Sequence, residues 1–200
     1  QRNIPVLFYS YVVDGTAYLD DMGRDPAALP RFYQFLEEGK APSTSQLNTF
    51  QYLEFFEPLL QQGDVLHIGF GTGMTPSVKN AEEAAQSLRE KYPERKILVV
   101  DSLAASMGEG LIVYYAAKMR QEGKTIDEVY QWVLDNRLRL CHWFTVDDLF
   151  FLHRGGRVSS ASAVLGTMLG VKPVLHVDDE GRLILVGKTR GRRKSLDQLV

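Results

Sequence analysis

The 200 residues carry 23 basic and 25 acidic side chains, giving a formal net charge of −2, and 44% of them are hydrophobic. This composition is typical of a globular protein with a core, and the balanced charge gives no reason to expect a nucleic acid partner or an anionic membrane surface. No run of about 18 apolar residues predicts a membrane-spanning segment. The single cysteine, Cys141, cannot form an internal disulfide, so we expect a reducing, cytoplasmic compartment.

The chain opens on a stretch rich in β-branched and aromatic residues, Ile4–Val13, which predicts a strand. An Asp-Gly turn then leads to a second short strand over Thr16–Leu19. Pro26–Glu38 has apolar residues at helical spacing and predicts a helix that ends at Gly39. A polar loop with three consecutive hydroxyl side chains is expected over 40–46.

From residue 60 to residue 140 the sequence alternates between short apolar runs and helical patterns. Two capping pairs strengthen the helix predictions, Asn48 with Gln51 and Thr125 with Glu128. The predicted elements are helices over 48–61, 77–91, 106–122 and 126–139, with strands over 65–68 and 96–100. This alternation predicts βαβ units and a parallel sheet, whose ligands bind at the carboxyl ends of the strands.

The pattern changes near residue 140, where we expect the first domain to end. The second part predicts a strand over 143–146, a helical turn over 147–152, a loop over 153–157, a small-residue helix over 160–169 and a hairpin of strands over 172–177 and 182–186. Five basic residues follow in 187–194. The expected fold class is therefore α/β: a parallel-sheet α/β/α domain over 1–140, then a smaller α/β domain over 141–200 with a largely antiparallel sheet. Because the sequence starts without Met and ends in a helical pattern, we expect a fragment or processed segment, in which this second domain is truncated.

A glycine-rich turn over 69–75 joins the strand over 65–68 to the next helix. Its glycines allow the backbone to turn sharply and to approach a ligand closely. Thr75 and Pro76 predict an N-cap followed by proline at the first helical position. The free amides of a helix N-terminus favour an anionic group, so this turn is a candidate binding site.

The same turn resembles the first motif of S-adenosylmethionine-dependent methyltransferases. Those enzymes place an acid at the end of the strand, where His67 and its neighbours supply none. The next acid that follows a strand, Asp101, lies farther along the chain than the ribose-binding acid of those enzymes. A methyltransferase remains the alternative function, and His67 is expected to be a hydrogen-bonded histidine of the core.

Other catalytic patterns are missing from the sequence. The four histidines have no ligand-like spacing and no Gly-x-Ser-x-Gly elbow occurs, so neither a metal site nor a serine hydrolase is expected. Ser102 is expected to cap the following helix. Hydroxyls at 43–45 precede one helix and those at 72, 75 and 77 precede the next, which suits a neutral cradle for a carboxylate or a phosphate. The alternative is that each hydroxyl only caps a helix or forms a turn.

Several motifs, in chain order, resemble those of one family, the DegV proteins of bacteria. The matching stretches, which together span nearly the whole chain, lie at 40–46, 72–81, 101–110, 152–158 and 171–175. Thr75 stands where the family has a serine, which preserves the hydroxyl, and Pro76 stands in place of a glycine.

The resemblance implies two α/β domains with a long-chain fatty acid between them, its carboxylate held by hydroxyls and its tail in an apolar tunnel. It implies a carrier rather than an enzyme, with no cofactor besides the bound fatty acid, and in some members the fatty acid is presented to a separate fatty acid kinase that makes acyl phosphate. We expect a monomer. The headgroup candidates carried over by position are Thr44, Thr75, Ser45, Gly73, Met74 and Arg157. Met107, Leu111, Met168 and Leu169 are candidates for the tunnel wall, and the basic residues of 188–194 could alternatively dock an acidic partner such as a kinase.

Overall fold

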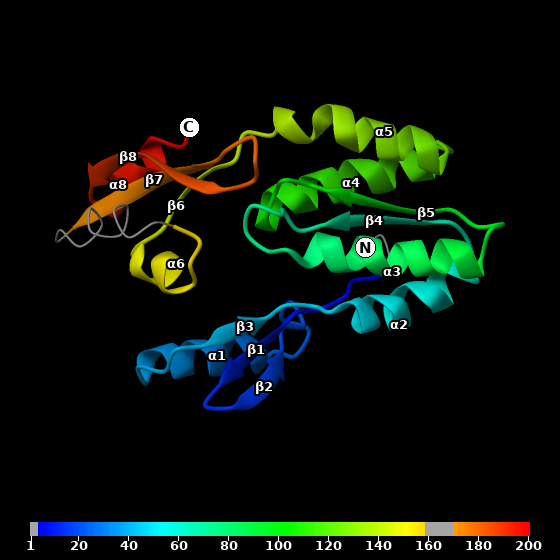
Figure 1. The fold of residues 1–200 in the computed structure, drawn as a ribbon. Helices are drawn as coiled ribbons and strands as arrows, with labels where there is room; N and C mark the ends of the chain where they lie inside the picture. Colours follow the sequence, from blue (N-terminus) through cyan, green and yellow to red (C-terminus); the bar gives the residue numbers. More distant parts are fainter. Residues whose placement is uncertain (1–3, 159–169) are drawn as a thin grey trace.

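Within residues 4–158 and 170–200, which the computed structural model describes, the strands form three sheets (Figure 1). A small antiparallel sheet comes from the N-terminal part, a parallel pair from the middle and a second antiparallel sheet from the C-terminal part. The predicted α/β class is confirmed, with a parallel sheet followed by an antiparallel one. The antiparallel sheet at the N-terminus was not predicted.

The N-terminal sheet has the strand order β2-β1-β3, with β1 at Ser10–Val13, β2 at Thr16–Leu19 and β3 at Ser43–Ser45. Helix α1 (Ala28–Glu37) lies between β2 and β3 in the chain. Two predictions are corrected here. The strand expected over 4–13 is limited to β1, and residues 4–9 lead into it without forming a strand. The loop expected over 40–46 contains β3, because β1 supplies hydrogen-bonding partners that the sequence of the loop does not reveal.

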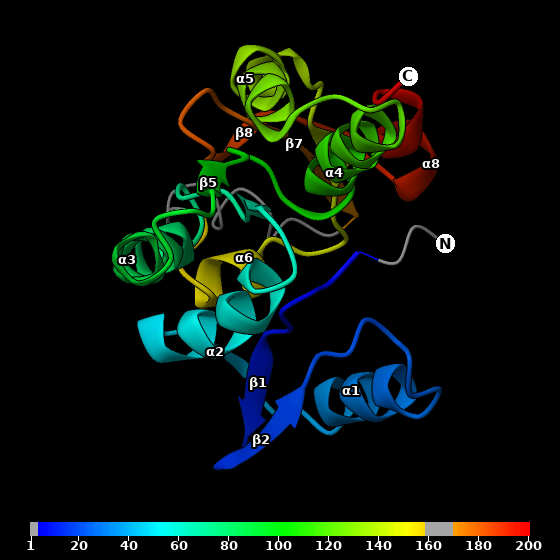
Figure 2. The same cartoon turned by 90° about the vertical axis from the view of Figure 1, so that its right-hand side faces the viewer.

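The parallel pair consists of β4 (Val65–Gly69) and β5 (Ile97–Asp101), which are in register along their whole length. Helices cover both faces, as Figures 1 and 2 show. These helices are α2 (Thr49–Leu60), α3 (Ser77–Lys91), α4 (Ser106–Gln121) and α5 (Ile126–Asn136). One apolar cluster joins α2 and α3 to the sheet and another joins α4 and α5 to it. This is the predicted three-layer arrangement, and both strands are nearly continuous apolar runs because both faces are buried.

Local sequence signals set several helix ends as predicted. Both capping boxes form, at the starts of α2 and α5. Helix α5 ends at Asn136, earlier than expected, and continues as the 3₁₀ turn η1 (Arg137–Arg139). None of the described helices combines the length and the apolar character needed to cross a membrane.

The C-terminal sheet has the order β6-β7-β8, with β6 at Trp143–Thr145, β7 at Val171–Val177 and β8 at Leu183–Arg190. Helix α6 (Phe150–Arg154) starts later than the predicted helical turn and includes residues expected in a loop. Helix α8 (Arg192–Asp197) follows β8. The hairpin is confirmed, but β8 is longer than expected, so part of the predicted basic tail belongs to a strand. The helix expected over 160–169 lies outside the described residues, as do Met168 and Leu169.

Candidate functional site

The glycine turn after β4 is joined to the turn after β5. The amide of Gly71 donates to the carbonyl of Ala104 at 2.8 Å, and a Cβ on Gly71 would lie 2.9 Å from the Ala104 nitrogen. The Asp101 carboxylate accepts hydrogen bonds from the amide of Thr72 at 3.2 Å, from its hydroxyl, and from the amide of Leu103 at 2.9 Å. The carboxyl ends of the two parallel strands are thereby joined into one platform, as expected from the sheet topology.

Asp101→Ala is expected to lower the free energy of unfolding by about 2 kcal/mol, because the amides of Thr72 and Leu103 lose their common acceptor. Thr72→Val removes only the hydroxyl bonded to this carboxylate and is the matched control, with an expected loss of less than half that amount. Urea denaturation of the two variants measures both effects. An Asp101→Ala protein as stable as the parent would show that the platform does not depend on this carboxylate.

The glycine turn also contacts the hairpin between β7 and β8. A Cβ built on Gly73 would lie 2.4 Å from the carbonyl carbon and oxygen of Gly181 and 2.6 Å from the carbonyl oxygen of Glu180. Gly181 has a positive φ of 76°, and a Cβ built on it would lie 3.5 Å from the amide nitrogen of Gly73. Only glycine allows the two backbones to approach this closely. The turn therefore joins the middle and C-terminal parts of the chain.

Hydroxyl groups gather at the start of α3. Thr75 is 9% exposed and Ser77 is 1% exposed, and their hydroxyl oxygens lie 3.0 Å apart. Helix α3 begins at Ser77 with Pro76 in the N-cap position and no side-chain cap, so the predicted capping role of Thr75 is wrong. Its hydroxyl is buried instead, beside that of Ser77, and interacts with the phenol of Tyr9.

The two phenols stay protonated in this environment. Burial raises the pKa of Tyr9, and hydrogen bonding with the hydroxyls of Ser77 and Thr75 offsets only part of that rise. Burial also raises the pKa of Tyr52, with a further contribution from its neighbour Tyr9. These four side chains, Tyr9, Tyr52, Thr75 and Ser77, are called the hydroxyl cluster below. The cluster is neutral and rich in donors, which suits an anionic oxygen ligand.

The second hydroxyl segment, β3, is attached to the same helix. In the pairing of β3 with β1, Ser45 lies opposite Ser10, the residue after Tyr9 of the hydroxyl cluster, and Thr44 lies opposite Tyr11. The side-chain amide of Asn80 in α3 donates to the carbonyl of Leu47 at 2.7 Å, shortly after β3. The structure therefore brings the 43–47 segment to the first turns of α3, with Thr44 and Ser45 exposed. Among the described residues, no hydrogen bond joins Thr44 to Thr75.

The whole chain, residues 1–200, matches the family model described as "Uncharacterised protein, DegV family". The chain belongs to the DegV family. A DegV domain-containing protein of Clostridium perfringens is 46% identical over 94% of this chain and 64% of its own length, so the chain spans less than two thirds of that relative. The resemblance seen in the motifs is confirmed, and the methyltransferase alternative is set aside.

Two solved structures extend the likeness of this DegV chain. A DegV family protein of Thermus thermophilus, described for its fatty acid binding, is 31% identical with a TM-score of 0.83, covering 99% of this chain and 68% of its own. The Fatty Acid Kinase (Fak) B3 protein of Streptococcus pneumoniae, loaded with linoleic acid, is 21% identical with a TM-score of 0.86, covering 99% of this chain and 72% of its own. The second likeness shows a shared fold.

Three other predicted positions of this DegV chain lie outside the hydroxyl cluster. The guanidinium of Arg157 is exposed and donates to the carbonyl of Gly155 within its own loop. Met74 is half-buried in the glycine turn, where its amide donates to the carbonyl of Gly71 at 3.0 Å. Ser102 is buried and accepts a hydrogen bond from the amide of Ala104 at 3.1 Å; since α4 starts later, at Ser106, the predicted capping role of Ser102 is wrong.

Sequence reasoning missed Tyr9, Tyr52 and Glu109. The two tyrosines lie in a predicted strand and a predicted helix, where aromatic residues are ordinary core candidates. Glu109 lies in the first turn of α4, where an acid is explained by the helix dipole. Burial raises the pKa of Glu109 to about 7. In the sequence, the only indication that Glu109 belongs to a site is its position within the stretch at 101–110 that resembles the family.

His67 is a half-buried residue of β4 that packs, as expected of a core histidine, against the rings of Tyr52 and Phe56, with centroids 5.4 and 5.1 Å away. Burial lowers its pKa to about 4. Its Nε2 has no hydrogen-bond partner among the described residues, so the expected hydrogen bond at that atom is missing. A neutral imidazole enclosed by aromatic rings belongs to the core rather than to a catalytic site.

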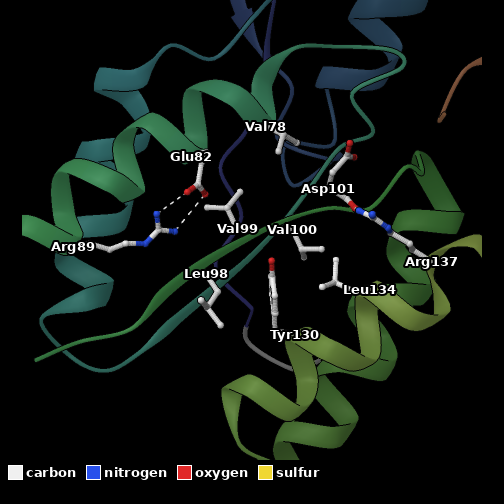
Figure 3. Close-up of a pocket in the computed structure, with 10 residues that line it drawn as sticks. All are labelled: Val78, Glu82, Arg89, Leu98, Val99, Val100, Asp101, Tyr130, Leu134 and Arg137. Atoms are coloured by element: carbon white, nitrogen blue, oxygen red, sulfur yellow. Dashed lines mark hydrogen bonds and ion pairs between the residues drawn. The ribbon is translucent and has the colours of Figure 1, made fainter. Parts of the chain in front are cut away.

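A hollow of about 430 Å³ lies at the outer edge of β5, between α3 and α5 (Figure 3). At one end Arg89 donates to the carbonyl of Ile97 at 2.9 and 3.0 Å and pairs with Glu82. At the other end Arg137 donates to the carbonyl of Asp101 at 2.8 Å. The two arginines thus occupy carbonyl acceptors on the side of β5 that faces away from β4, where no other strand pairs with it among the described residues. No group of His, Cys, Asp or Glu side chains suited to a metal occurs in the part of the chain that the structure describes.

Proposed function

We propose that this protein binds a long-chain fatty acid between the parts formed by residues 1–140 and 141–200. The observation that carries the proposal is the likeness to the Thermus thermophilus protein, which is described for its fatty acid binding and matches 99% of this chain at 31% identity. The contact of Gly73 with Gly181 supports a site between the two parts, because it brings the β7–β8 hairpin onto the glycine turn.

In this proposal the carboxylate headgroup lies at the hydroxyl cluster. Thr75 donates to it from the start of α3, and Thr44 and Ser45 donate from β3, with Gly73 and Met74 in the adjoining turn. Arg157 is a candidate for the headgroup only if its side chain leaves the Gly155 carbonyl. Burial of an acyl chain contributes about 0.8 kcal/mol per CH₂, so the tail supplies most of the affinity and the hydroxyls set the orientation.

The proposal includes a role as a carrier, with the chemistry performed elsewhere. Neutral donors hold a carboxylate without neutralising it, which leaves an oxygen free to attack a phosphoryl group in the active site of a separate fatty acid kinase. The shared fold with the Fak B3 protein supports this step. We also propose that the protein is a cytoplasmic monomer, a placement supported by its single cysteine.

Organic extraction of the purified protein is expected to release a fatty acid detectable by mass spectrometry. Thr44→Val and Thr75→Val are each expected to weaken fatty acid binding about tenfold, because each removes a hydrogen bond to a charged oxygen. Thr16→Val, on the exposed strand β2, is the matched control and should bind as the parent does. Protein without bound lipid that also takes up no added fatty acid would refute the proposal, and unchanged affinity in the double variant would refute the headgroup assignment.

A further inference from the structure

Glu109 is a titratable group beside the hydroxyl cluster that the proposed function does not use. Its side chain is half-buried in the first turn of α4. Among the described residues, no lysine, arginine or hydrogen-bond donor pairs with its carboxylate. The loop before α4 is bonded to the glycine turn through Gly71 and Ala104, so the start of α4 is fixed relative to the cluster.

The groups that face Glu109 provide no compensating positive charge. Burial is the main cause of the raised pKa values of Tyr9 in the N-terminal segment and of Tyr52 in α2, and the negative charge of Glu109 contributes to both. Glu109 therefore interacts electrostatically with both phenols. The ring of His142 lies against Gly108, the residue before Glu109 in the chain, where a Cβ would meet its atoms at 1.9 to 2.6 Å. Burial, and then the nearby His176, lower the pKa of His142, so this imidazole is neutral near pH 7. An ionised Glu109 therefore adds a net negative charge next to the cluster.

We propose that Glu109 couples ligand binding to proton uptake: the hydroxyl cluster accepts an anionic carboxylate when Glu109 is protonated and disfavours it when Glu109 is ionised. This inference rests on the proposed function. Two carboxylates that share a desolvated site do not both remain ionised at low cost, so binding of the first raises the proton affinity of the second. The proton comes from solvent and stays on Glu109 while the ligand is bound. The raised pKa of the free Glu109 places this coupling near neutral pH.

The affinity for dodecanoate, measured by titration calorimetry below its micellar concentration at pH 6.5 and pH 8.5, tests the coupling. For the parent protein we expect about tenfold weaker binding at the higher pH. Glu109→Gln should bind with similar affinity at both pH values. Glu122→Gln, on the exposed end of α4, is the matched control and should retain the pH dependence of the parent. Dodecanol, which has no charge, should bind all three proteins independently of pH.

A second measurement needs only the parent protein. Titration at pH 7.5 in two buffers with different ionisation enthalpies reports the number of protons taken up. We expect about 0.6 per dodecanoate, because a carboxyl with a pKa of about 7 is already partly protonated at this pH, and zero per dodecanol. Dodecanoate binding without proton uptake, or a Glu109→Gln protein that keeps the pH dependence, would overturn the coupling while leaving the proposed function intact. Failure of both ligands to bind at either pH would overturn the proposed function and the coupling with it.

Discussion

Gly73→Ala is expected to lower the free energy of unfolding by about 3 kcal/mol, a large effect for one methyl group. The new Cβ would lie 2.4 Å from two backbone atoms of Gly181 and 2.6 Å from the carbonyl oxygen of Glu180. Side chains can turn away from such an overlap, but a hairpin backbone cannot, so the glycine turn and the β7–β8 hairpin must separate. The same separation should weaken fatty acid binding, since the proposed site lies between these two parts.

Gly110→Ala is the matched control for this prediction. Gly110 lies inside α4, and a Cβ built there meets no atom within 4 Å. Alanine is the better helix former, so this variant should be more stable than the parent by up to about 1 kcal/mol. Chemical denaturation of the parent and both variants measures the two opposite shifts. Equal stabilities of the two variants would show that the close backbone contact at Gly73 does not contribute to stability.

Features of the fold that depend on neighbouring residues in the chain were predictable from the sequence. The capping boxes at Asn48 and Thr125 form because both partners lie within one helical turn. The alternating apolar runs predicted β4 and β5, and the parallel topology then placed the glycine turn and Asp101 at the same edge of the sheet. The order of the motifs was sufficient to predict the family, because several weak signals in one order are far more specific than any one of them.

Features that depend on a distant partner were not predictable. Ser43–Ser45 becomes a strand because β1, about 30 residues earlier, offers an edge, and its polar side chains alone indicate a loop. Thr75 precedes a proline, a local pattern typical of an N-cap. The helix starts one position later than that pattern predicts, and the Thr75 hydroxyl pairs with Ser77 in a buried cluster instead.

The hydroxyl cluster shows the same limit at the candidate site. Its phenols come from a segment before β1 and from α2, far from the glycine turn in sequence, and no spacing rule connects them to Thr75. Tertiary packing alone brings them together, and it also buries the carboxyl of Glu109. The residues that set the electrostatics of the site are thus the ones with the weakest sequence signal, whereas the hydroxyls on the loops were identified from the motifs.

His67→Phe is expected to reduce the loss of stability that the protein suffers in acid. Burial lowers the pKa of His67 from 6.5 to about 4, so between these values the unfolded chain binds more protons than the folded one. The stability that His67 contributes is full above pH 6.5 and is lost as the pH falls through 4, up to about 3 kcal/mol in total. Phenylalanine suits the aromatic pocket of Tyr52 and Phe56 and cannot be protonated. The difference in unfolding free energy between pH 7 and pH 4.5 should therefore shrink, and this difference cancels any effect of the larger ring on packing.

Ionisation of Glu109 changes the free energy of unfolding in the opposite direction over the same pH range. The pair therefore provides an internal check on the sign of each pH dependence. Burial raises the pKa of Glu109 from 4.5 to about 7, so its contribution to stability is full below pH 4.5 and is lost as the pH rises through 7. Glu109→Gln should therefore gain stability at pH 8 relative to pH 4.5, by about 1–2 kcal/mol for this half-buried group, whereas His67→Phe should gain it in acid. Profiles that shift in the same direction in both variants would contradict the burial argument for at least one of these two side chains.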